Sequence, residues 1–312
     1  MNRELPSAIG FEMTTKCNSL CPMCLRRDYQ IVNEDMDFSL LEKTVDEVKR
    51  WPHEGILFNL TGLSEPTLYP RLLESVMHIK RHIPHSRVKI ITNGIALTNG
   101  LSKGLLQARL DEITISLNGT TPEDYLAICG VDHFEEVTQN IEALIENRRD
   151  LKASTLCINL NLKRHEANAA FIQNAVAKWR PLLNDKDVIS ISDILPLRGD
   201  SPVETCVTAY TRYPCAHLWG EIKLDIQGNI YPCDGKVMDY HYRGKSELFL
   251  GNIYDMSIKE AYLSDKVRRT RKSHLDGKFF MVPTCQACPS WSRFPNYWML
   301  NKYFPFLKKR WL

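Results

Sequence analysis

KCNSLCPMC, residues 16–24, brings three cysteines together near the beginning of a 312-residue chain. A closed tetrahedral zinc site needs four donors, usually Cys or His. No other cysteine lies among the first 52 residues, and the first histidine is His53. Cys17, Cys21 and Cys24 therefore predict a metal centre with one open position, where a substrate or a cofactor can bind.

The composition of the whole chain narrows its class. The net charge of +3 is close to balance, whereas a nucleic-acid-binding protein is expected to carry a strong basic excess. No early apolar run has the flanks of a signal peptide, and no stretch approaches the ~18–20 apolar residues of a membrane span. We therefore expect a cytoplasmic protein with no nucleic-acid partner and no integral membrane span. In that compartment, ten cysteines favour metal binding or catalysis over disulfide bonds.

Short apolar runs alternate with helical patterns on both sides of the cysteine stretch. Strands are expected at 8–14, 55–62, 87–94, 112–119, 155–163 and 187–197. Amphipathic helices are expected at 39–51, with Ser39 as the N-cap, and at 69–83, 134–149 and 166–179. This alternation predicts a parallel sheet with right-handed crossovers. Six such units favour an open α/β barrel, a partial (β/α)6 TIM-like fold, over a closed eight-stranded one.

The pattern changes after PLRGDSPVETC, residues 196–206, which is typical of a linker. The sequence therefore predicts a barrel domain at 1–200 and a small α+β domain at 201–312. In the second domain, residues 219–233 predict a β-hairpin that turns at 227–229. The basic segment 266–272 follows as part of a helix and is expected to be a solvated face, with attraction of an anionic substrate as the alternative.

The spacing C-x3-C-x2-C after a first strand resembles the radical S-adenosylmethionine (radical SAM) superfamily. Zinc or a redox pair is the alternative for short spacings of this kind. The resemblance implies that Cys17, Cys21 and Cys24 hold three irons of a [4Fe–4S] cluster and that the fourth iron binds S-adenosylmethionine. It also implies reductive cleavage of that cofactor to a 5′-deoxyadenosyl radical, with an electron donor such as flavodoxin or ferredoxin.

Three strand ends extend the resemblance. TGLSEP (61–66) stands where the family has a Gly-Gly-Glu-Pro-like motif, and TNG (92–94) and SLNG (116–119) stand where members contact the cofactor ribose and carboxylate. Ordinary strand-end turn residues are the alternative interpretation. The implied cofactor-binding residues are Met23, Gly62, Ser64, Glu65, Asn93, Ser116, Asn118 and Asn161.

The sequence departs from the family pattern at these same places. Leu63 and Ser64 replace glycines of the Gly-Gly-Glu-Pro-like motif. Asn118 stands where an aspartate is common, and Met23 stands where an aromatic residue usually precedes the third cysteine. A methionine can still cover the adenine with polarizable apolar surface.

Four cysteines in the second half form another set that resembles the twitch domain, a shortened SPASM domain: Cys215, Cys233, Cys285 and Cys288. The resemblance implies that four thiolates close the coordination of an auxiliary [4Fe–4S] cluster, with zinc as the alternative. The aromatic and basic tail, 292–311, is expected to pack over this cluster; a substrate lid or a contact with a membrane surface are the alternatives.

Three cysteines remain outside both sets. Cys157 lies in a predicted strand and is expected to be a small buried core residue. Cys129 is expected in a loop near the barrel mouth, and Cys206 ends the linker segment 196–206, just before the four auxiliary cysteines. Either of these two thiols could donate a hydrogen atom to a carbon radical; a structural role is the alternative for each.

The resemblance implies a radical enzyme that abstracts hydrogen from a small-molecule or peptide substrate. The leading prediction is oxidation of a secondary alcohol in a sugar or aminocyclitol, with the auxiliary cluster as electron acceptor. Epimerisation with Cys129 or Cys206 as hydrogen donor is an alternative, and peptide maturation is another. Only about seven residues precede the first expected strand, so no peptide-recognition domain is expected there. A cluster-bearing electron carrier without catalytic activity is the alternative from another class.

Overall fold

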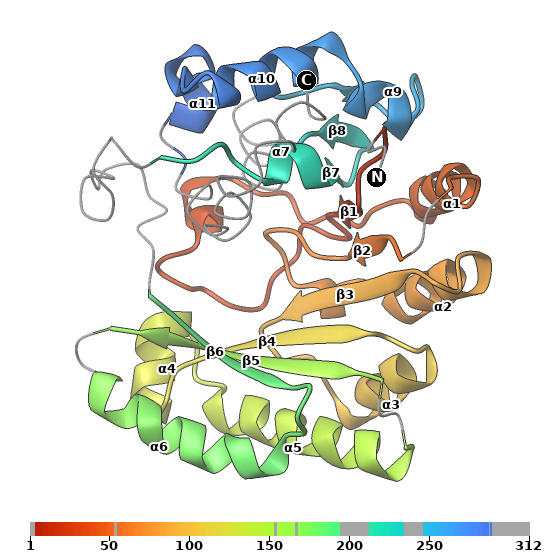
Figure 1. Ribbon diagram of the computed structural model, residues 1–312. Helices are drawn as coiled ribbons and strands as arrows, with labels where there is room; N and C mark the ends of the chain where they lie inside the picture. Colours follow the sequence, from red (N-terminus) through yellow and green to blue (C-terminus); the bar gives the residue numbers. More distant parts are fainter. Residues whose placement is uncertain are drawn as a thin grey trace. The chain divides into compact units, whose positions relative to one another are not determined.

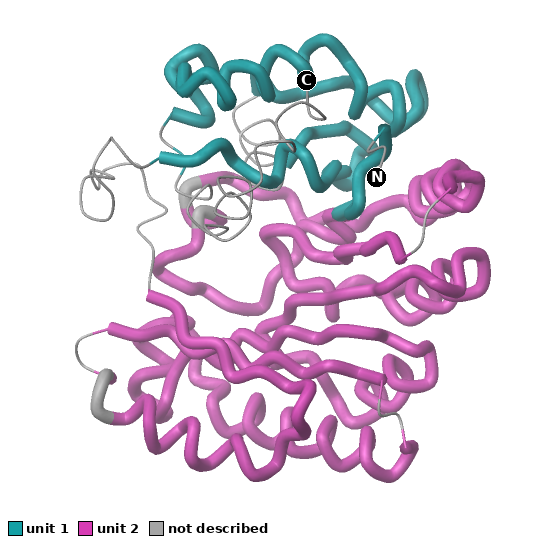
Figure 2. The backbone as a smooth tube through the Cα atoms, viewed as in Figure 1, with its two compact units in different colours: residues 1–10, 199–312 teal, residues 11–198 magenta. Residues whose placement is uncertain are grey.

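The computed structural model describes residues 4–52, 55–152, 155–165, 168–193, 212–233, 246–286 and 288. The chain divides into two compact units (Figure 2): unit 2 comprises residues 11–198, and unit 1 comprises residues 1–10 and 199–312. The predicted linker at 196–206, the boundary at 200/201, Cys206 and the tail at 292–311 lie outside the described residues. The predicted domain limits therefore stay a prediction.

Unit 2 repeats a strand followed by a helix. Its strands are β2 (Leu57–Asn59), β3 (Arg87–Thr92), β4 (Glu112–Asn118), β5 (Cys157–Arg164) and β6 (Val188–Asp193). They lie in the order β6-β5-β4-β3-β2, and each neighbouring pair is parallel. The helices are α1 (Phe38–Val48), α2 (Leu72–His82), α3 (Asn99–Gln107), α4 (Pro122–Cys129), α5 (Phe134–Asp150) and α6 (Ala169–Trp179). The short 3-10 helices of this unit are η1 (Leu25–Asp28), η2 (Pro66–Leu68) and η4 (Arg180–Leu182).

The helices of unit 2 cover one face of its sheet (Figure 1). In β5, Ile158, Leu160 and Leu162 are fully buried and alternate with half-buried polar residues, because successive strand side chains point to opposite faces. We call the second face, opposite the helices, the open face. The alternation places an apolar layer under the helices and polar groups on the open face. The parallel strands with helices on one face (Figure 1) match the barrel-like arrangement that the sequence predicts.

The N-cap of helix α1 differs from the predicted one. Asp37, not Ser39, is the N-cap: its carboxylate accepts a hydrogen bond from the backbone N–H of Ser39. Both residue types cap well, so the sequence alone did not separate them. The buried face of the helix follows the expected spacing, with Leu41, Val45 and Val48 fully buried.

Helices α3 and α4 were not predicted. Helix α3 contains two glycines, which weaken any helical signal, and its N-cap is Thr98. Helix α4 is eight residues long with only weak apolar periodicity. It begins at the N-cap Thr121 and ends at Gly130, whose φ of 71° is the left-handed conformation that closes many helices. Both helices are recognised by their capping residues more readily than by their apolar pattern.

Unit 1 is a smaller α+β body. Its strands are β1 (Ala8–Phe11, of which only Phe11 belongs to unit 2), β7 (Glu221–Leu224), β8 (Asn229–Tyr231) and β9 (Gly251–Asn252), in the order β1-β7-β8-β9. Strands β7 and β8 form the predicted hairpin, with the turn at 225–228. The helices are α7 (His217–Gly220), α9 (Ile258–Tyr262), α10 (Asp265–Leu275), η8 (Phe279–Met281) and α11 (Pro283–Gln286).

The basic segment of helix α10 is only partly a solvated face. Arg268 is exposed, as predicted. Arg271 is 9% exposed, its Nε donates to the carbonyl of Leu218 at 2.8 Å, and its guanidinium lies over the ring of Tyr262. The solvated-face prediction is therefore wrong for Arg271, which holds the helix against its own unit. Within the described part of the chain, no helix has the length and apolar character needed to cross a membrane.

Candidate active site

The predicted ligands of the first cluster lie on a loop in unit 2 that follows the first strand. Cys17, Cys21 and Cys24 are half-buried and form no disulfide. A tight turn carries the last two, because the N–H of Cys24 donates to the carbonyl of Cys21 at 3.0 Å. Helix η1 begins directly after it. The loop therefore presents three thiols from one short segment, as the spacing predicts.

Through hydrogen bonds, Glu65 connects this loop to the carboxyl ends of strands β2 and β3. It is 2% exposed, and its own N–H donates to the carbonyl of Lys16 at 2.8 Å. Its carboxylate accepts from Thr67 N–H and hydroxyl, from the Thr92 hydroxyl at 2.6 Å and from Asn93 N–H at 2.7 Å. Burial raises the pKa of Glu65, and these donors oppose that shift. The carboxylate of Glu65, one of the implied cofactor-binding residues, is thus bound on both oxygens by its own chain.

Asn93 links the third strand end to the cysteine loop. Its side-chain amide donates to Asn18 Oδ1 at 2.7 Å, and its Oδ1 accepts from the N–H of Ile95 at 3.0 Å. Asn18 was not predicted as a site residue, although it lies between the first two cysteines. Its position within the cysteine motif is the signal that could have identified it.

Two predicted cofactor-binding residues carry a buried polar atom without a hydrogen-bond partner in the described structure, Ser64 Oγ and Asn118 Oδ1. Asn118 also has a left-handed backbone, with φ of 60°. At Gly62, an added Cβ would lie 2.6 Å from Glu12 Cγ, so only glycine fits there. Unpaired buried acceptors are costly unless a ligand or water satisfies them. These orphaned atoms fit a polar cofactor bound beside the cysteine loop.

Cys129 lies at the last position of helix α4 and is 1% exposed. The predicted loop is therefore wrong, because the unpredicted helix includes this residue and buries it, although its contacts lie with the cysteine loop. Its Sγ accepts from the Asn118 amide at 3.6 Å. Its carbonyl accepts from Leu20 N–H and from the Ser19 hydroxyl, both at 3.0 Å.

The surroundings of the cysteine loop give its thiols different pKa values. Burial raises the pKa of Cys17 to about 11. The hydrogen bond with Cys129, followed by one with Ser19, outweighs burial and lowers the pKa of Cys21 to about 6. The charge of Lys163 contributes in the same direction. A thiol with a low pKa is the readiest to bind metal as a thiolate.

The open face continues the site along β4, β5 and β6. Ser116 and Asn161 pair in register and are both half-buried, and the Asn161 amide donates to Ser190 Oγ at 2.9 Å. Lys163 donates to Ser192 Oγ at 3.0 Å and was not predicted, although the period-two pattern of β5 places it on this face. Cys157 is half-buried on the same face and donates to the carbonyl of Lys186 at 3.1 Å. The prediction that Cys157 is a buried core residue is therefore wrong.

Of the eight predicted cofactor-binding residues, five lie close to the cysteine loop in sequence or through the contacts above: Met23, Ser64, Glu65, Asn93 and Asn118. Among the described residues, no three Cys, His, Asp or Glu side chains are grouped tightly enough to bind one metal ion. A [4Fe–4S] cluster does not need that grouping, because each thiolate binds a different iron. The loop therefore suits a cluster through its three thiols and its adjoining orphaned acceptors.

The second cysteine set lies wholly in unit 1. Cys233 packs against the apolar cluster that contains Cys285, and the N–H of Cys288 donates to the carbonyl of Cys285 at 3.2 Å. After burial, Cys215, Cys285 and Cys288 each raise the pKa of Cys233. Burial raises the pKa of Cys215 to about 11 and that of Cys285 to about 12. Cys285 packs with Leu248 and Val282 in a small apolar cluster. Buried thiols with raised pKa values need a cationic metal centre to hold them as thiolates.

Two side chains of the second set escaped prediction. Arg212 donates to the carbonyls of Cys285 and Gln286, and burial lowers its pKa while three of the cysteines oppose that shift. His274, 1% exposed, accepts from the N–H of Cys215 at 3.1 Å through Nδ1, and burial lowers its pKa to about 4. Nothing in the sequence marks either residue, because both lie far along the chain from the cysteines they approach.

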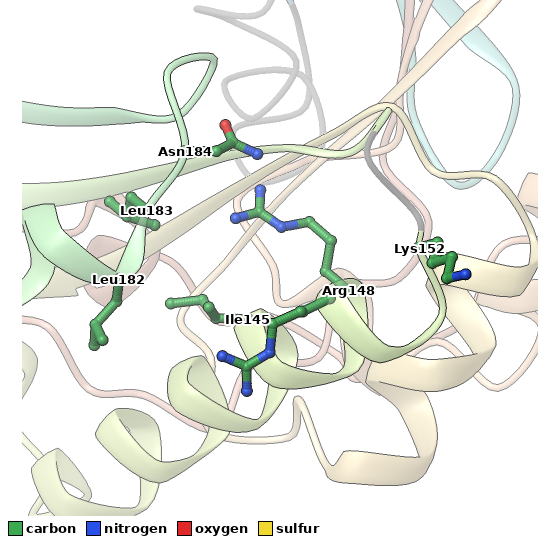
Figure 3. Close-up of a pocket in the computed structure, with 7 residues that line it drawn as sticks. Ile145, Arg148, Lys152, Leu182, Leu183 and Asn184 are labelled. Carbon is green, nitrogen blue, oxygen red and sulfur yellow. The ribbon is translucent and has the colours of Figure 1, made fainter.

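A pocket of about 310 Å³ lies elsewhere in unit 2, between the end of helix α5 and the segment that precedes β6 (Figure 3). Ile145, Arg148 and Lys152 line one side of it, and Leu182 and Asn184 line the other. This is the amino end of strands β5 and β6, whereas the cofactor-binding residues lie at the carboxyl ends of the strands. In parallel βα folds the chemistry gathers at the carboxyl ends, so we do not assign the active site to this pocket.

Comparison with known proteins agrees with both cysteine sets. The model of the radical SAM superfamily matches residues 11–169, just over half of the chain. The model of SPASM, an iron–sulfur cluster-binding domain, matches residues 215–289. A curated relative is a tungsten-containing aldehyde ferredoxin oxidoreductase cofactor-modifying protein of Pyrococcus furiosus. It is 25% identical over 313 residues, which cover 89% of this chain and 85% of that protein.

Solved structures share the fold. BtrN, in complex with AdoMet and 2-DOIA, has a TM-score of 0.61 at 16% identity, over 91% of this chain and 93% of that one. Native anSMEcpe, with bound AdoMet and the Cp18Cys peptide, has a TM-score of 0.63 at 18% identity, over 85% of this chain and 82% of that one. At these identities the likeness establishes the fold alone. The partial barrel followed by an auxiliary cluster domain is therefore confirmed.

Proposed function

The chain belongs to the radical SAM superfamily, and from this premise we propose that it oxidises a secondary alcohol of a sugar or an aminocyclitol. The cofactors are iron–sulfur clusters and S-adenosylmethionine, and the second cluster domain accompanies the first. When bound, these groups supply a 5′-deoxyadenosyl radical that removes a hydrogen atom from the substrate, and an auxiliary acceptor for the second electron. Flavodoxin or ferredoxin is the proposed electron donor.

In this proposal the residues of unit 2 bind and orient the cofactor. Cys17, Cys21 and Cys24 each bind one iron and leave the fourth without a thiolate. Ser64 Oγ and Asn118 Oδ1 are buried acceptors that a cofactor donor can satisfy. The open face, through Asn161 and Lys163, offers hydrogen bonds to a hydroxyl-rich substrate. The remaining residues predicted to bind the cofactor are Met23, Gly62, Glu65, Asn93 and Ser116.

One observation favours oxidation, namely the composition of the second cysteine set. Cys215, Cys233, Cys285 and Cys288 lie close enough to influence one another, and four thiolates leave no iron open for substrate. A closed cluster can still accept an electron. The substrate carbon would then lose one hydrogen atom, one electron to this cluster and the hydroxyl proton to solvent, which gives a ketone. Arg212 would offset the negative charge that the cluster gains.

The test uses the purified protein, reconstituted anaerobically with iron and sulfide, with dithionite, S-adenosylmethionine and a panel of aminocyclitols and sugars. Oxidation gives 5′-deoxyadenosine together with a product two hydrogens lighter by mass spectrometry. The double variant C285A/C288A should still cleave the cofactor but yield no ketone, whereas C157A, outside both cysteine sets, should behave as wild type. Ketone formation by the double variant at the wild-type rate would contradict an electron-accepting auxiliary cluster.

Peptide modification is the second candidate, favoured by the fold shared with anSMEcpe, which was solved with a bound peptide. The same assay with peptide substrates separates the two. Epimerisation, with Cys129 or Cys206 as hydrogen donor, predicts deuterium in the product from deuterated water and no loss of mass. The burial of Cys129 counts against it as the donor. Formation of any 5′-deoxyadenosine would exclude an electron carrier without catalytic activity.

A further inference from the structure

A histidine that follows strand β5 is bound to a carboxylate of helix α4. His165 Nε2 lies 2.6 Å from Asp124 Oδ1, and the two side chains are 30% and 9% exposed. His165 comes one residue after the end of β5, and Asp124 lies in the first turn of α4, which follows β4. The pair therefore stands at the carboxyl ends of two neighbouring strands, where parallel βα folds carry out their chemistry.

The surrounding hydrogen bonds hold both members of the pair in place. Asp124 Oδ2 accepts from the N–H and the hydroxyl of Thr120, at 2.7 and 2.8 Å, and from the Asn168 amide at 3.0 Å. Asn168 Oδ1 accepts in turn from the backbone N–H of His165 at 3.0 Å. Asn168 is 2% exposed, so a buried side chain connects the carboxylate to the backbone that carries the histidine.

These contacts decide which ring nitrogen of His165 carries the proton. Burial raises the pKa of Asp124, but hydrogen bonds from its three neighbours outweigh burial and hold the pKa below its usual value. The ionised carboxylate can only accept, so the Nε2–H of His165 is the donor. When the ring is neutral, Nδ1 is then an acceptor. Among the described residues, none hydrogen bonds to Nδ1.

The pattern of β5 directs the histidine toward the open face. Lys163 lies on that face, and the strand period of two reaches His165 next. The other charged groups at this end of β5 and β6 have bonds of their own, because Lys163 donates to Ser192 and Arg164 pairs with Asp193. Asp124 is therefore the charged group that acts most directly on the ring of His165.

We propose that His165 is a catalytic residue, whose Nδ1 accepts the hydroxyl proton of the alcohol that is oxidised. This rests on the proposed function, in which the substrate carbon loses a hydrogen atom to the 5′-deoxyadenosyl radical and one electron to the auxiliary cluster. The O–H bond then breaks, its electron pair stays on oxygen, and the C=O double bond forms. The proton is held on Nδ1 before it passes to solvent, and the Asp124 carboxylate stabilises the imidazolium.

Two substitutions and one control test it. H165A removes the base, whereas H165Q keeps an amide that can donate to Asp124 but has no basic nitrogen. The control is H133A, because His133 also pairs with a carboxylate, that of Glu136 at 2.7 Å.

Each reconstituted protein is assayed with the panel of aminocyclitols and sugars, deuterated at their carbon-bound positions. Deuterium in 5′-deoxyadenosine reports the hydrogen-atom transfer, and ketone reports the complete reaction. Iron content and circular dichroism are measured in parallel, and H165A is also assayed with added imidazole.

The expected result is that H165A and H165Q still transfer deuterium to 5′-deoxyadenosine but form ketone about 100-fold more slowly, since a positioned base contributes roughly 10²–10⁴-fold. Imidazole should restore ketone formation by H165A, which a merely structural role of His165 would not allow. H133A should behave as wild type.

Ketone formation by H165Q at the wild-type rate overturns the proposal, and so does a folded H165A that imidazole does not rescue. If H165A loses iron or its fold, H165Q decides: deuterium transfer with slow ketone formation supports the proposal, and any other result overturns it. A wild-type protein that forms no ketone from any member of the panel refutes the proposed oxidation, and the role of His165 with it. Wild-type ketone formation with an unchanged H165Q refutes the role of His165 alone.

Discussion

Replacing Arg148 tests whether a buried ion pair sets the register of the open face. The Arg148 guanidinium binds both carboxylate oxygens of Asp187 at 2.7 Å, and the two side chains are 7% and 0% exposed. Asp187 also accepts from the N–H of Ile158, the second residue of β5, and from the N–H of Asn184 before β6, each at 2.8 Å. The pair therefore fixes β6 beside β5, on which the contacts of Asn161 depend.

R148M should lower the free energy of unfolding of unit 2 by ~3–5 kcal/mol, because it leaves the Asp187 carboxylate buried without its counter-charge. Arg164 and Asp193 provide a matched control at the other end of the same two strands. This pair is also bidentate, at 2.8 and 3.2 Å, but its side chains are 55% and 64% exposed. R164M should therefore cost at most about 1 kcal/mol.

The assay is urea unfolding of each variant at pH 7, followed by circular dichroism. Equal costs for R148M and R164M, or a cost below about 1 kcal/mol for R148M, would refute the reasoning from burial.

The pH dependence of the free energy of unfolding supplies a second check. Burial raises the pKa of Asp187, but hydrogen bonds from Arg148, Ile158 and Asn184 outweigh it and hold the pKa below 3.8. The stabilisation is therefore complete well above pH 3.8 and is lost as the pH falls through the folded-state value, so the gap between wild type and R148M should narrow in acid.

Three further predictions concern the two cluster sites. G130A should reduce iron bound at the first cluster without unfolding unit 2, because a Cβ there meets the Leu20 carbonyl; full iron content by colorimetric assay would contradict this. S64A should weaken S-adenosylmethionine binding several-fold and leave iron content unchanged, as measured by equilibrium dialysis; unchanged affinity would mean that the orphaned hydroxyl faces no cofactor. R212M should make the auxiliary midpoint potential more negative, because the cation that offsets the added charge is gone, and a potential equal to wild type would remove Arg212 from this role.

The strands and the cysteine sets could be predicted because each has a strong local signal. Strand β5 alternates apolar and polar residues, and the first cysteine set lies within nine residues. The contacts between site residues that lie far apart in the sequence could not be predicted in this way. Asn118 contacts Cys129, and the Cys129 carbonyl contacts Ser19 and Leu20 of the cysteine loop, only because β4 and α4 bring these residues back to the loop. Helix α4 itself has weak apolar periodicity.

Residues around the second set were harder still. His274 is separated from Cys215 by 59 positions, and Arg212 reaches Cys285 across 73. No spacing rule connects such pairs, since the fold of unit 1 alone brings them together. The misplacement of Cys129 and Cys157 has a related cause. A cysteine in an apolar run fits a core, a strand face or a helix end equally well, and only the neighbouring elements decide among them.

The hydrogen bonds of Glu65 have a consequence for the protein when a cluster is lost. Through this one carboxylate and its own amide, the chain joins the cysteine loop, the second strand end and the third without help from iron. Loss of a cluster would thus leave these hydrogen bonds in place, and with them the position of the cysteine loop beside the two strand ends.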